Sequence, residues 1–169
     1  MVTVRPVEKI NNMNGGKNIK ETILGFLNNH HTMSLATSRD DCPFAASLFY
    51  ANDGFIIYFL SSPVSQHSLN LSQNPNVAIT INKDYSEWRM IKGLQIIGKA
   101  DKVPEEELPI VIKTYSEKHS FVRLILWDRN FSSRIVDVGF FKVIPETVRL
   151  IDNEVGFGYK VEIHITEKP

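Results

Sequence analysis

The sequence predicts a mainly β domain in which six or seven antiparallel strands, flanked by helices, close into a barrel. From residue 32 onward, segments with the two-residue alternation of a strand are separated by short turn signals. One of these segments, residues 55–61, is apolar on both faces and is therefore expected to be deeply buried. Consecutive strands that are apolar on both sides indicate a barrel rather than an open sheet.

A helix should precede the first strand. Behind Asn18, which is suited to cap a helix, apolar residues recur at helical spacing: Ile19, Ile23, Phe26 and Leu27. Residues 1–16 end in Asn14-Gly15-Gly16 and are expected to form a loose N-terminal arm, which leaves residues 17–169 as the folded domain.

The remaining elements follow in order, each bounded by turn residues. Strand patterns lie at residues 32–38, 44–51, 55–61, 76–82, 90–103 and 138–152, with a last short strand in the glycine-broken tail 153–165. Asn52-Asp53-Gly54 is a hairpin signal. A short helix is expected at 65–74, and another is expected to begin at Pro104, because the three glutamates that follow suit a positive helix end. Residues 120–130 are apolar but ambiguous in period.

Composition points to one intracellular domain. A chain of 169 residues has the size of one ordinary domain with a real core. The 19 basic and 19 acidic side chains give a formal net charge of zero, which argues against nucleic acid as the main partner. Cys42 is the only cysteine, so neither an internal disulfide nor a cysteine-based zinc site is expected, as suits a reducing cytoplasm. The sequence shows no signal-peptide pattern and no apolar run long enough for a membrane span, so no membrane partner is expected.

The stretch SSPVSQHSLNL, residues 61–71, is the first candidate for a binding site. It places hydroxyl groups and a histidine where a short helix follows a buried strand, an arrangement that suits an anion such as a phosphate. Ser61, Ser62 and Ser65 would donate from their hydroxyl groups, and His67 would donate when protonated. The simpler interpretation is that Ser65 only caps the helix and His67 lies at the surface.

The segment KGLQIIG, residues 92–98, is the second candidate. In a strand, Gly93, Gln95 and Ile97 share one face, so the glutamine could hydrogen-bond the edge of a flat heteroaromatic ligand beside the glycine. The alternative is an edge-strand glutamine in water.

The sequence gives little support for a metal site or for thiol chemistry. The histidines show no metal-binding spacing, so no metal site is predicted. Cys42, beside Pro43 in a predicted turn, is expected to be an inert thiol. Trp88 and Trp127 lie near element boundaries and are either core residues or contacts of a dimer.

Two longer segments carry a family resemblance: LATSRDDCPFAASLFYANDGFIIYFLSSPVSQHSLNLSQNPNVAITI, followed by KGLQIIGKA. Together they resemble the FMN-binding split barrel of the pyridoxamine 5'-phosphate oxidase superfamily over residues 20–158. The C-terminal segment IPETVRLIDNEVGFGYK is similar to an uncharacterised bacterial subfamily rather than to the oxidase itself. The resemblance implies a homodimer of six-stranded antiparallel split barrels, with two FMN molecules in clefts between the subunits.

The resemblance also implies which residues hold the cofactor. Ser61 and Ser62 stand where the oxidase has Thr-Asn, and Ser65 matches its serine. Gln66 and His67 replace the arginine and lysine that grip the phosphate, and Ala45 and Tyr50 stand near the positions of an arginine and a lysine on the oxidase's second strand. The oxidase glutamine falls at Gly93, one same-face step from Gln95. The complete implied set is Ser47, Leu48, Phe49, Leu60, Ser61, Ser62, Ser65, Gln66, His67, Gly93 and Gln95, with the backbone N–H groups of residues 47–49 as further donors.

The predicted function is FMN binding, with FMN-dependent oxidoreductase or flavin reductase activity and a small-molecule redox partner or NAD(P)H as electron donor. No residue is assigned an acid–base role, and the oxidase's C-terminal Arg-and-His substrate pair has no clear counterpart. The alternatives are a non-catalytic flavin carrier or redox sensor, and a related split-barrel protein that binds heme or deazaflavin. For heme, the candidate axial ligands are His30, His31 and His164. The dimer is expected to be obligate, with Phe49, Trp88 and Trp127 at its interface.

Overall fold

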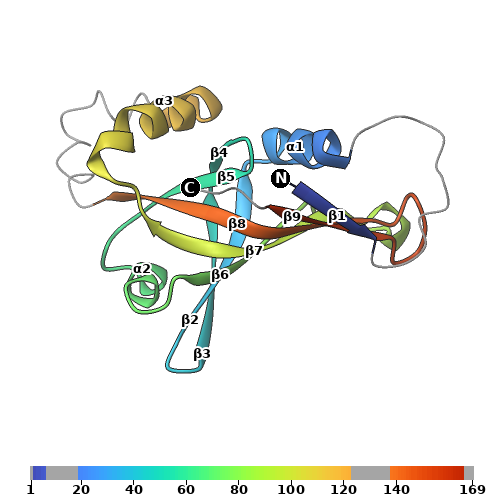
Figure 1. Ribbon diagram of the computed structural model, residues 1–169, viewed down its shortest axis with the longest axis horizontal. Coiled ribbons are helices and arrows are strands. Elements are labelled where there is room, and N and C mark those ends of the chain that lie inside the picture. The colour runs from blue at the N-terminus through green and yellow to red at the C-terminus, as the bar shows by residue number, and fades with distance from the viewer. Residues whose placement is uncertain (1, 7–18, 123–137, 166–169) are drawn as a thin grey trace.

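The computed structural model describes residues 2–6, 19–122 and 138–165, which form one antiparallel sheet with helices packed on it (Figure 1). The strands are β1 (Val2–Pro6), β2 (Thr32–Arg39), β3 (Cys42–Phe49), β4 (Ala51–Asp53), β5 (Ile56–Ser61), β6 (Asn76–Asn82), β7 (Lys92–Lys102), β8 (Gly139–Asp152) and β9 (Lys160–Ile165). The helices are α1 (Ile19–Asn29), α2 (Gln66–Leu71) and α3 (Leu108–Lys118), with 3₁₀ turns at Trp88–Met90 and Glu105–Glu107.

The sheet follows the order β1-β9-β8-β7-β6-β2-β3. Strand β8 pairs with β7 along one edge and with β5 and β9 along the other. Along that second edge, the first part of β8 pairs with β5 and the later part pairs with β9. The described residues form nine strands instead of the expected six or seven, chiefly because β1 and the three-residue β4 carry little local signal. The fold is a mainly β split barrel with flanking helices, as predicted, but the expected closure is wrong: no ladder joins β3 to β5 among the described strands.

A bulge bends β8 at the point where its partner changes. Ile97 pairs with Thr147 whereas Gly98 pairs with Pro145, so Glu146 is the extra residue. A Cβ atom at Gly98 would lie 2.3 Å from the carbonyl oxygen of Ile144. Glycine is therefore required here because the two backbones approach too closely for any side chain. Strand β8 continues through Pro145 as one strand.

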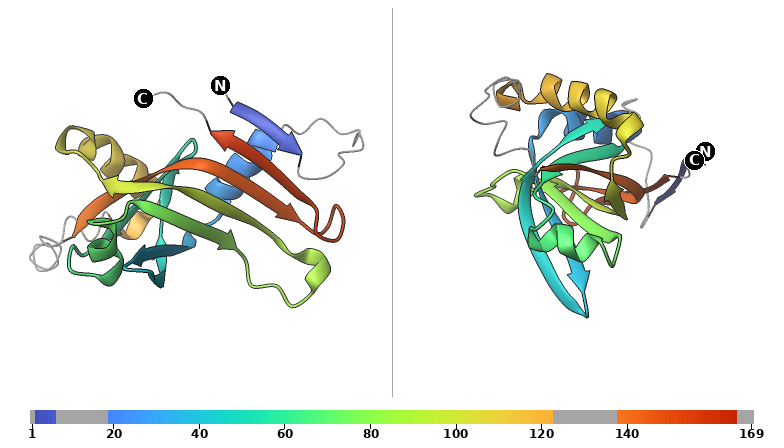
Figure 2. Two further views of the ribbon diagram at one scale, coloured as in Figure 1. Left: turned by 60° about the horizontal axis from the view of Figure 1, so that its bottom comes forward. Right: turned by 90° about the vertical axis from the view of Figure 1, so that its left-hand side faces the viewer.

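The core lies under the helices, and α1 and α3 lie on the same side of the sheet (Figure 2). Ile23 and Leu27 of α1 are fully buried against Leu35 of β2, in register with the predicted helical spacing. The helix α3 packs Val111 and Tyr115 into a smaller apolar cluster. Its proline at the first turn is Pro109, whereas the expected Pro104 opens the preceding 3₁₀ turn.

The structure bears on the expected N-terminal arm but not on Trp127. The N-terminal strand β1 occupies part of the segment expected to be a loose arm, and Trp127 lies outside the described residues. Within the described ranges, no helix is long and apolar enough to cross a membrane.

Candidate functional site

The sheet splits between β3 and β5, and most of the predicted cofactor residues border this split. The β4–β5 ladder ends where Ala51 pairs with Tyr58, and beyond that point β3 and β5 have no register in common. The short helix α2 follows β5 and packs against β2, where Asn70 Nδ2 donates to Thr37 Oγ1 at 3.1 Å. The region between the free edge of β3 and the end of β5 is the candidate site.

A hydroxyl–imidazole cluster, formed by Ser61, Ser65 and His67, lies at the end of β5. The Ser61 and Ser65 hydroxyl groups lie 2.9 Å apart, and Nε2 of His67 shares hydrogen bonds with both. Ser61 and His67 are each only 7% exposed. The structure therefore brings together three of the predicted phosphate ligands, but it buries His67, which the simpler interpretation placed at the surface.

The serines also organise the start of α2. Ser65 is the N-cap, and its Oγ accepts from the Ser68 backbone N–H at 3.4 Å while donating to the Ser68 hydroxyl at 2.9 Å. Ser62 is half-buried, and its Oγ accepts from the backbone N–H of Val64 at 3.4 Å. Gln66 is exposed and turns away from the cluster, because its Nε2 donates to Asn70 Oδ1 at 2.8 Å.

The surroundings of His67 favour its neutral form in the free protein. Its ring lies 6.3 Å from the Phe59 ring and stacks at 6.4 Å on Phe44 of β3. Burial lowers the pKa of His67 below its ordinary value of 6.5 because a charged imidazole loses hydration there. Near neutral pH the imidazole therefore holds the two serine hydroxyls without a charge of its own.

The edge strand β3 adds backbone donors that no described strand pairs with. The Tyr50 N–H donates to the His31 carbonyl at 3.0 Å, which makes Tyr50 and His31 a hydrogen-bonded pair across β2 and β3. Antiparallel ladders alternate, so Leu48 also points its N–H group at β2, whereas Ser47 and Phe49 point theirs at the free edge. Leu48 packs against the core, and Leu60 at the end of β5 packs against the smaller apolar cluster.

The structure does not bring Gly93 and Gln95 to this cluster. Both lie on β7, and Arg149 Nη1 donates to Gln95 Oε1 at 3.2 Å, which ties the glutamine to β8. A Cβ atom at Gly93 would lie 2.9 Å from the Ile81 carbonyl oxygen, so the glycine permits close approach of β6 rather than making room for a ligand. The two residues do border a hollow of about 510 Å³ beside the loop at residues 82–85.

The outward face of β6 and β7 is exposed in the described chain and mixes apolar, polar and charged side chains. Burial alternates along β6, and the exposed side chains on β6 and β7 include Ala78, Thr80, Gln95 and Ile97, the last being 54% exposed. Phe49, predicted as an interface residue, is 50% exposed, and Trp88 is 49% exposed. An exposed face that carries an apolar side chain such as Ile97 suits a partner surface.

The histidines proposed as heme ligands lie in three different places. His30 Nδ1 bonds the Phe26 carbonyl at 2.8 Å, His31 lies at the edge of the His119 ring, and His164 bonds Thr147 at 3.3 Å and pairs with Glu162. The described part of the chain holds no group of three or more His, Cys, Asp or Glu side chains that could bind a metal ion. Cys42 is exposed.

A second histidine cluster, around His119, escaped the sequence analysis. His119 is 4% exposed, and its Nε2 donates to the Tyr50 carbonyl at 2.7 Å. Next to it, Lys118 Nζ donates to the Leu27 carbonyl at 2.7 Å and lies 3.9 Å from the centre of the Tyr50 ring. Burial lowers the pKa of Lys118 to about 8. The only sequence signal was a Lys-His pair at the end of a helix.

Comparison with known families identifies the chain's relatives. Residues 19–152 match the family model described as pyridoxamine 5'-phosphate oxidase. A UPF0306 protein of Klebsiella pneumoniae is 23% identical over 138 residues, covering 80% of this chain and 86% of the relative. A UPF0306 protein of Photorhabdus laumondii is 26% identical over 151 residues, covering 88% of this chain and 97% of the relative.

Solved structures share the fold. A putative pyridoxamine 5'-phosphate oxidase from Listeria innocua has a TM-score of 0.63 at 21% identity, over 80% of this chain and 99% of its own. A heme binding protein from Mycobacterium smegmatis has a TM-score of 0.71 at 16% identity, over 88% of this chain and 59% of its own. A FAD-binding protein from Mesorhizobium loti has a TM-score of 0.61 at 16% identity, over 98% of this chain and 99% of its own. At these identities the likeness establishes the fold alone.

Proposed function

Because the chain belongs to the pyridoxamine 5'-phosphate oxidase family, with UPF0306 proteins rather than the oxidase itself as its relatives, we propose that it is an FMN-binding protein. The proposed activity is that of an FMN-dependent oxidoreductase or flavin reductase, with a small-molecule partner or NAD(P)H as electron donor. A FAD-binding protein shares the fold over nearly its whole length, which is consistent with a flavin.

The observation that carries the proposal is the hydroxyl–imidazole cluster beside the free edge of β3. Ser62 and Ser65 are only half-buried, so their hydroxyl groups are within reach of an anion from solvent. The N–H groups of Ser47 and Phe49 point at the same free edge and have no ladder partner there among the described strands. Neutral donors of this kind bind a phosphate without a permanent cation, but more weakly than an arginine or lysine would.

The chain's own residues would position the cofactor, and bound FMN would supply the electron transfer. Ser62 and Ser65 would bind the phosphate, Ser65 by turning its hydroxyl away from Ser68, while the neutral imidazole of His67 holds the Ser61 and Ser65 hydroxyls through hydrogen bonds. Phe44 covers one side of that imidazole and limits the access of water to it.

The outward face of β6 and β7 is the proposed dimer interface. A homodimer built on this face would bury Ile97 and bring Gln95 of one protomer toward the split of its partner. This arrangement explains why Gln95 is remote from the serine cluster within one chain. It also implies that a monomer has an incomplete site.

The first experiment is the absorption spectrum and FMN titration of the purified protein. Flavin bands, and FMN affinity that falls about 10-fold in Ser65→Ala, would support the proposal, since a hydrogen bond to a charged group contributes about 1.5–3 kcal/mol. Ser72→Ala is the matched control, because Ser72 lies at the other end of α2 and donates to the Leu69 carbonyl at 2.8 Å. A Soret band without flavin bands would contradict the proposal and favour heme.

Turnover and mass separate the remaining alternatives. NAD(P)H oxidation faster than that of free FMN would establish a reductase, whereas an unchanged rate would leave a flavin carrier or redox sensor. Light scattering should give twice the chain mass of 19.3 kDa. A monomer at micromolar concentration would contradict the dimer and the role assigned to Gln95.

A further inference from the structure

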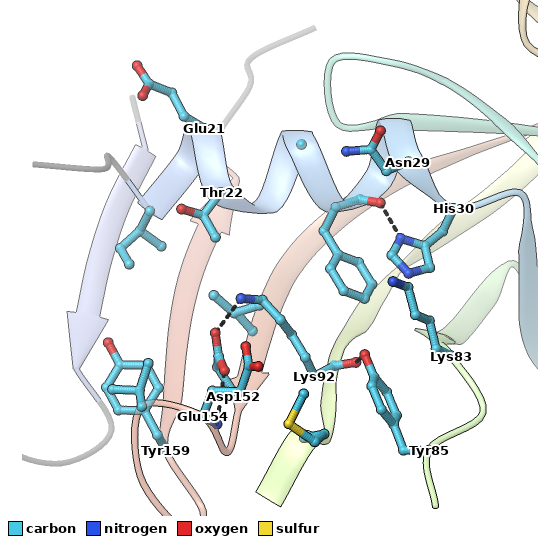
Figure 3. Close-up of a pocket in the computed structure, with 16 residues that line it drawn as sticks. Glu21, Thr22, Asn29, His30, Lys83, Tyr85, Lys92, Asp152, Glu154 and Tyr159 are labelled. Atoms are coloured by element: carbon cyan, nitrogen blue, oxygen red, sulfur yellow. Dashed lines mark hydrogen bonds and ion pairs between the residues drawn. The ribbon is translucent and has the colours of Figure 1, made fainter.

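A second cavity, of about 820 Å³, shares no lining residue with the serine cluster, and Figure 3 shows the residues that line it. Its walls come from α1, from the loop that contains Lys83 and Tyr85, and from the ends of β7 and β8 with the turn that follows. Phe26, Met90 and Leu150 contribute apolar surface to it. The volume is sufficient for a small molecule.

His30 brings an unpartnered ring nitrogen to this cavity. Its Nδ1 lies 2.8 Å from the Phe26 carbonyl, which can only accept, so Nδ1 carries the proton and a neutral ring has its lone pair on Nε2. The ring stacks on Phe26 at 3.8 Å, which fixes its orientation. Nε2 is buried and has no hydrogen-bond partner among the described residues. A buried acceptor left unpaired is costly, so a donor supplied from elsewhere is expected.

Gly25 opens the helical wall of the same cavity. It lies in the middle of α1, where glycine costs about 1 kcal/mol relative to alanine. No atom lies within 4 Å of the position that its Cβ would occupy, so the glycine is not required by packing in the chain itself. The missing side chain leaves space on the cavity side of the helix.

The charges around the cavity disfavour an anionic ligand. Its lining includes three carboxylates, Glu21, Asp152 and Glu154, but two ammonium groups, Lys83 and Lys92. Lys92 is already paired with Asp152 at 2.5 Å. Figure 3 shows Lys83 pointing toward His30, yet it makes no hydrogen bond to Nε2, and its exposed side chain is able to move aside. A neutral ligand therefore suits this cavity better than a phosphate-bearing one.

We propose that this cavity binds a small, planar, largely apolar molecule whose single N–H or O–H group donates to Nε2 of His30. The apolar wall holds the body of the molecule, and the space beside Gly25 admits its plane. The site is independent of the flavin proposal, because it shares no residue with the serine cluster and disfavours anions.

Indole and 1-methylindole are the probes, since they differ in shape by one methyl group and only indole has an N–H donor. Calorimetric titration should show indole binding about 3- to 10-fold more tightly, the effect of one hydrogen bond. His30→Phe keeps an aromatic ring over Phe26 but removes the acceptor, so it should abolish the difference between the probes. The FMN content of His30→Phe should equal that of the wild type. Equal affinities for the two probes in the wild type, or no binding at millimolar concentration, would overturn the proposal.

A second variant tests the location. Gly25→Leu fills the open side of α1 with a strong helix former, so it should lower indole affinity at least 10-fold while the Tm stays equal or rises. Gly156→Leu is the matched control, because Gly156 is also open but does not line the cavity. Undiminished indole binding in Gly25→Leu would place the ligand elsewhere. A Soret band from added hemin that His30→Phe removes would also overturn the proposed ligand class, in favour of an iron-bound ligand.

Discussion

Two histidines, His67 and His119, are buried to almost the same extent in opposite chemical settings. His67, at 7% exposed, is bonded to the serine hydroxyls, which can rotate and change partners. His119, at 4% exposed, donates to the fixed Tyr50 carbonyl and is enclosed by the rings of Tyr115 and Phe49 at 4.9 and 5.5 Å. Burial alone therefore does not identify a functional histidine.

The two histidines differ in what their hydrogen-bond partners permit. A hydroxyl both donates and accepts, so the partners of His67 tolerate either protonation state or a new ligand. A carbonyl only accepts, and the rings around His119 leave it one orientation. We therefore assign His67 to the candidate site and His119 to the structure that joins α3 to the start of β4.

The largest expected effect is a difference in the free energy of unfolding lost when each histidine is replaced by alanine. His119→Ala should cost about 3 kcal/mol in the free energy of unfolding, because it removes a buried ring and leaves the Tyr50 carbonyl unpaired. His67→Ala should cost about 1 kcal/mol, because Ser61 and Ser65 already bond each other and water can enter. Urea denaturation measures both, and equal losses would remove the distinction.

The next effect concerns FMN affinity against pH. Burial lowers the pKa of His67, so the ring is neutral at pH 7.5 and takes a proton beside a bound phosphate only on acidification. FMN should therefore bind about 10-fold more tightly at pH 5.5 than at pH 7.5, and affinity should be flat from pH 7.5 to 8.5.

Two controls accompany this measurement. Riboflavin, which lacks the phosphate, should show no such change with pH, and His67→Asn should flatten the FMN curve. A riboflavin curve that rises in parallel with the FMN curve would show that the phosphate does not contact His67.

A smaller effect belongs to the region around His119. Burial lowers the pKa of Lys118 to about 8, below the unfolded value of 10.5. Between these values the unfolded chain binds more protons than the folded one, so stability rises with pH. From pH 7.5 to 9.5 the wild type should gain up to about 1 kcal/mol relative to Lys118→Met, an amount limited by solvent screening of this partly exposed group. Denaturation of both proteins across that pH range tests the sign of this change in stability. A stability that falls as the pH rises would instead mean that the Leu27 carbonyl and the Tyr50 ring stabilise the ammonium group.

The smallest expected effect is that of Cys42→Ser, which serves as the reference for both histidine clusters. Cys42 is exposed in the hairpin between β2 and β3 and bonds to neither histidine cluster. Cys42→Ser should change the free energy of unfolding by less than about 0.5 kcal/mol and leave FMN turnover intact. Loss of turnover at normal FMN content would instead point to thiol chemistry.

Local patterns in the sequence predicted most of the fold. The helical spacing of Ile23 and Leu27 and the alternation along β2 and β6 reflect which side of each element is buried. The strand β1 was missed because its pairing with β9 joins residues far apart in sequence, and no local period reports such a contact.

The site was predictable in part. Ser61, Ser65 and His67 lie within seven residues, so the strand-to-helix transition brings them together and the sequence shows it. The burial of His67 depends on Phe44 from another strand, and the position of Gln95 depends on Arg149 from β8. Those contacts are set by the tertiary fold, so residue spacing alone could not give them.

The pairing of β1 with β9 has a consequence for how the sheet is protected. Both strands lie outside residues 19–152, the segment that matches the family model, and they pair with each other in antiparallel register from Val2 with Ile165 to Pro6 with Val161. Strand β1 thereby covers the edge of β9 and is itself the last strand on this side of the sheet. A chain that lacked residues 2–6 would expose a hydrogen-bonding edge along β9, a template on which other molecules could add strands and aggregate.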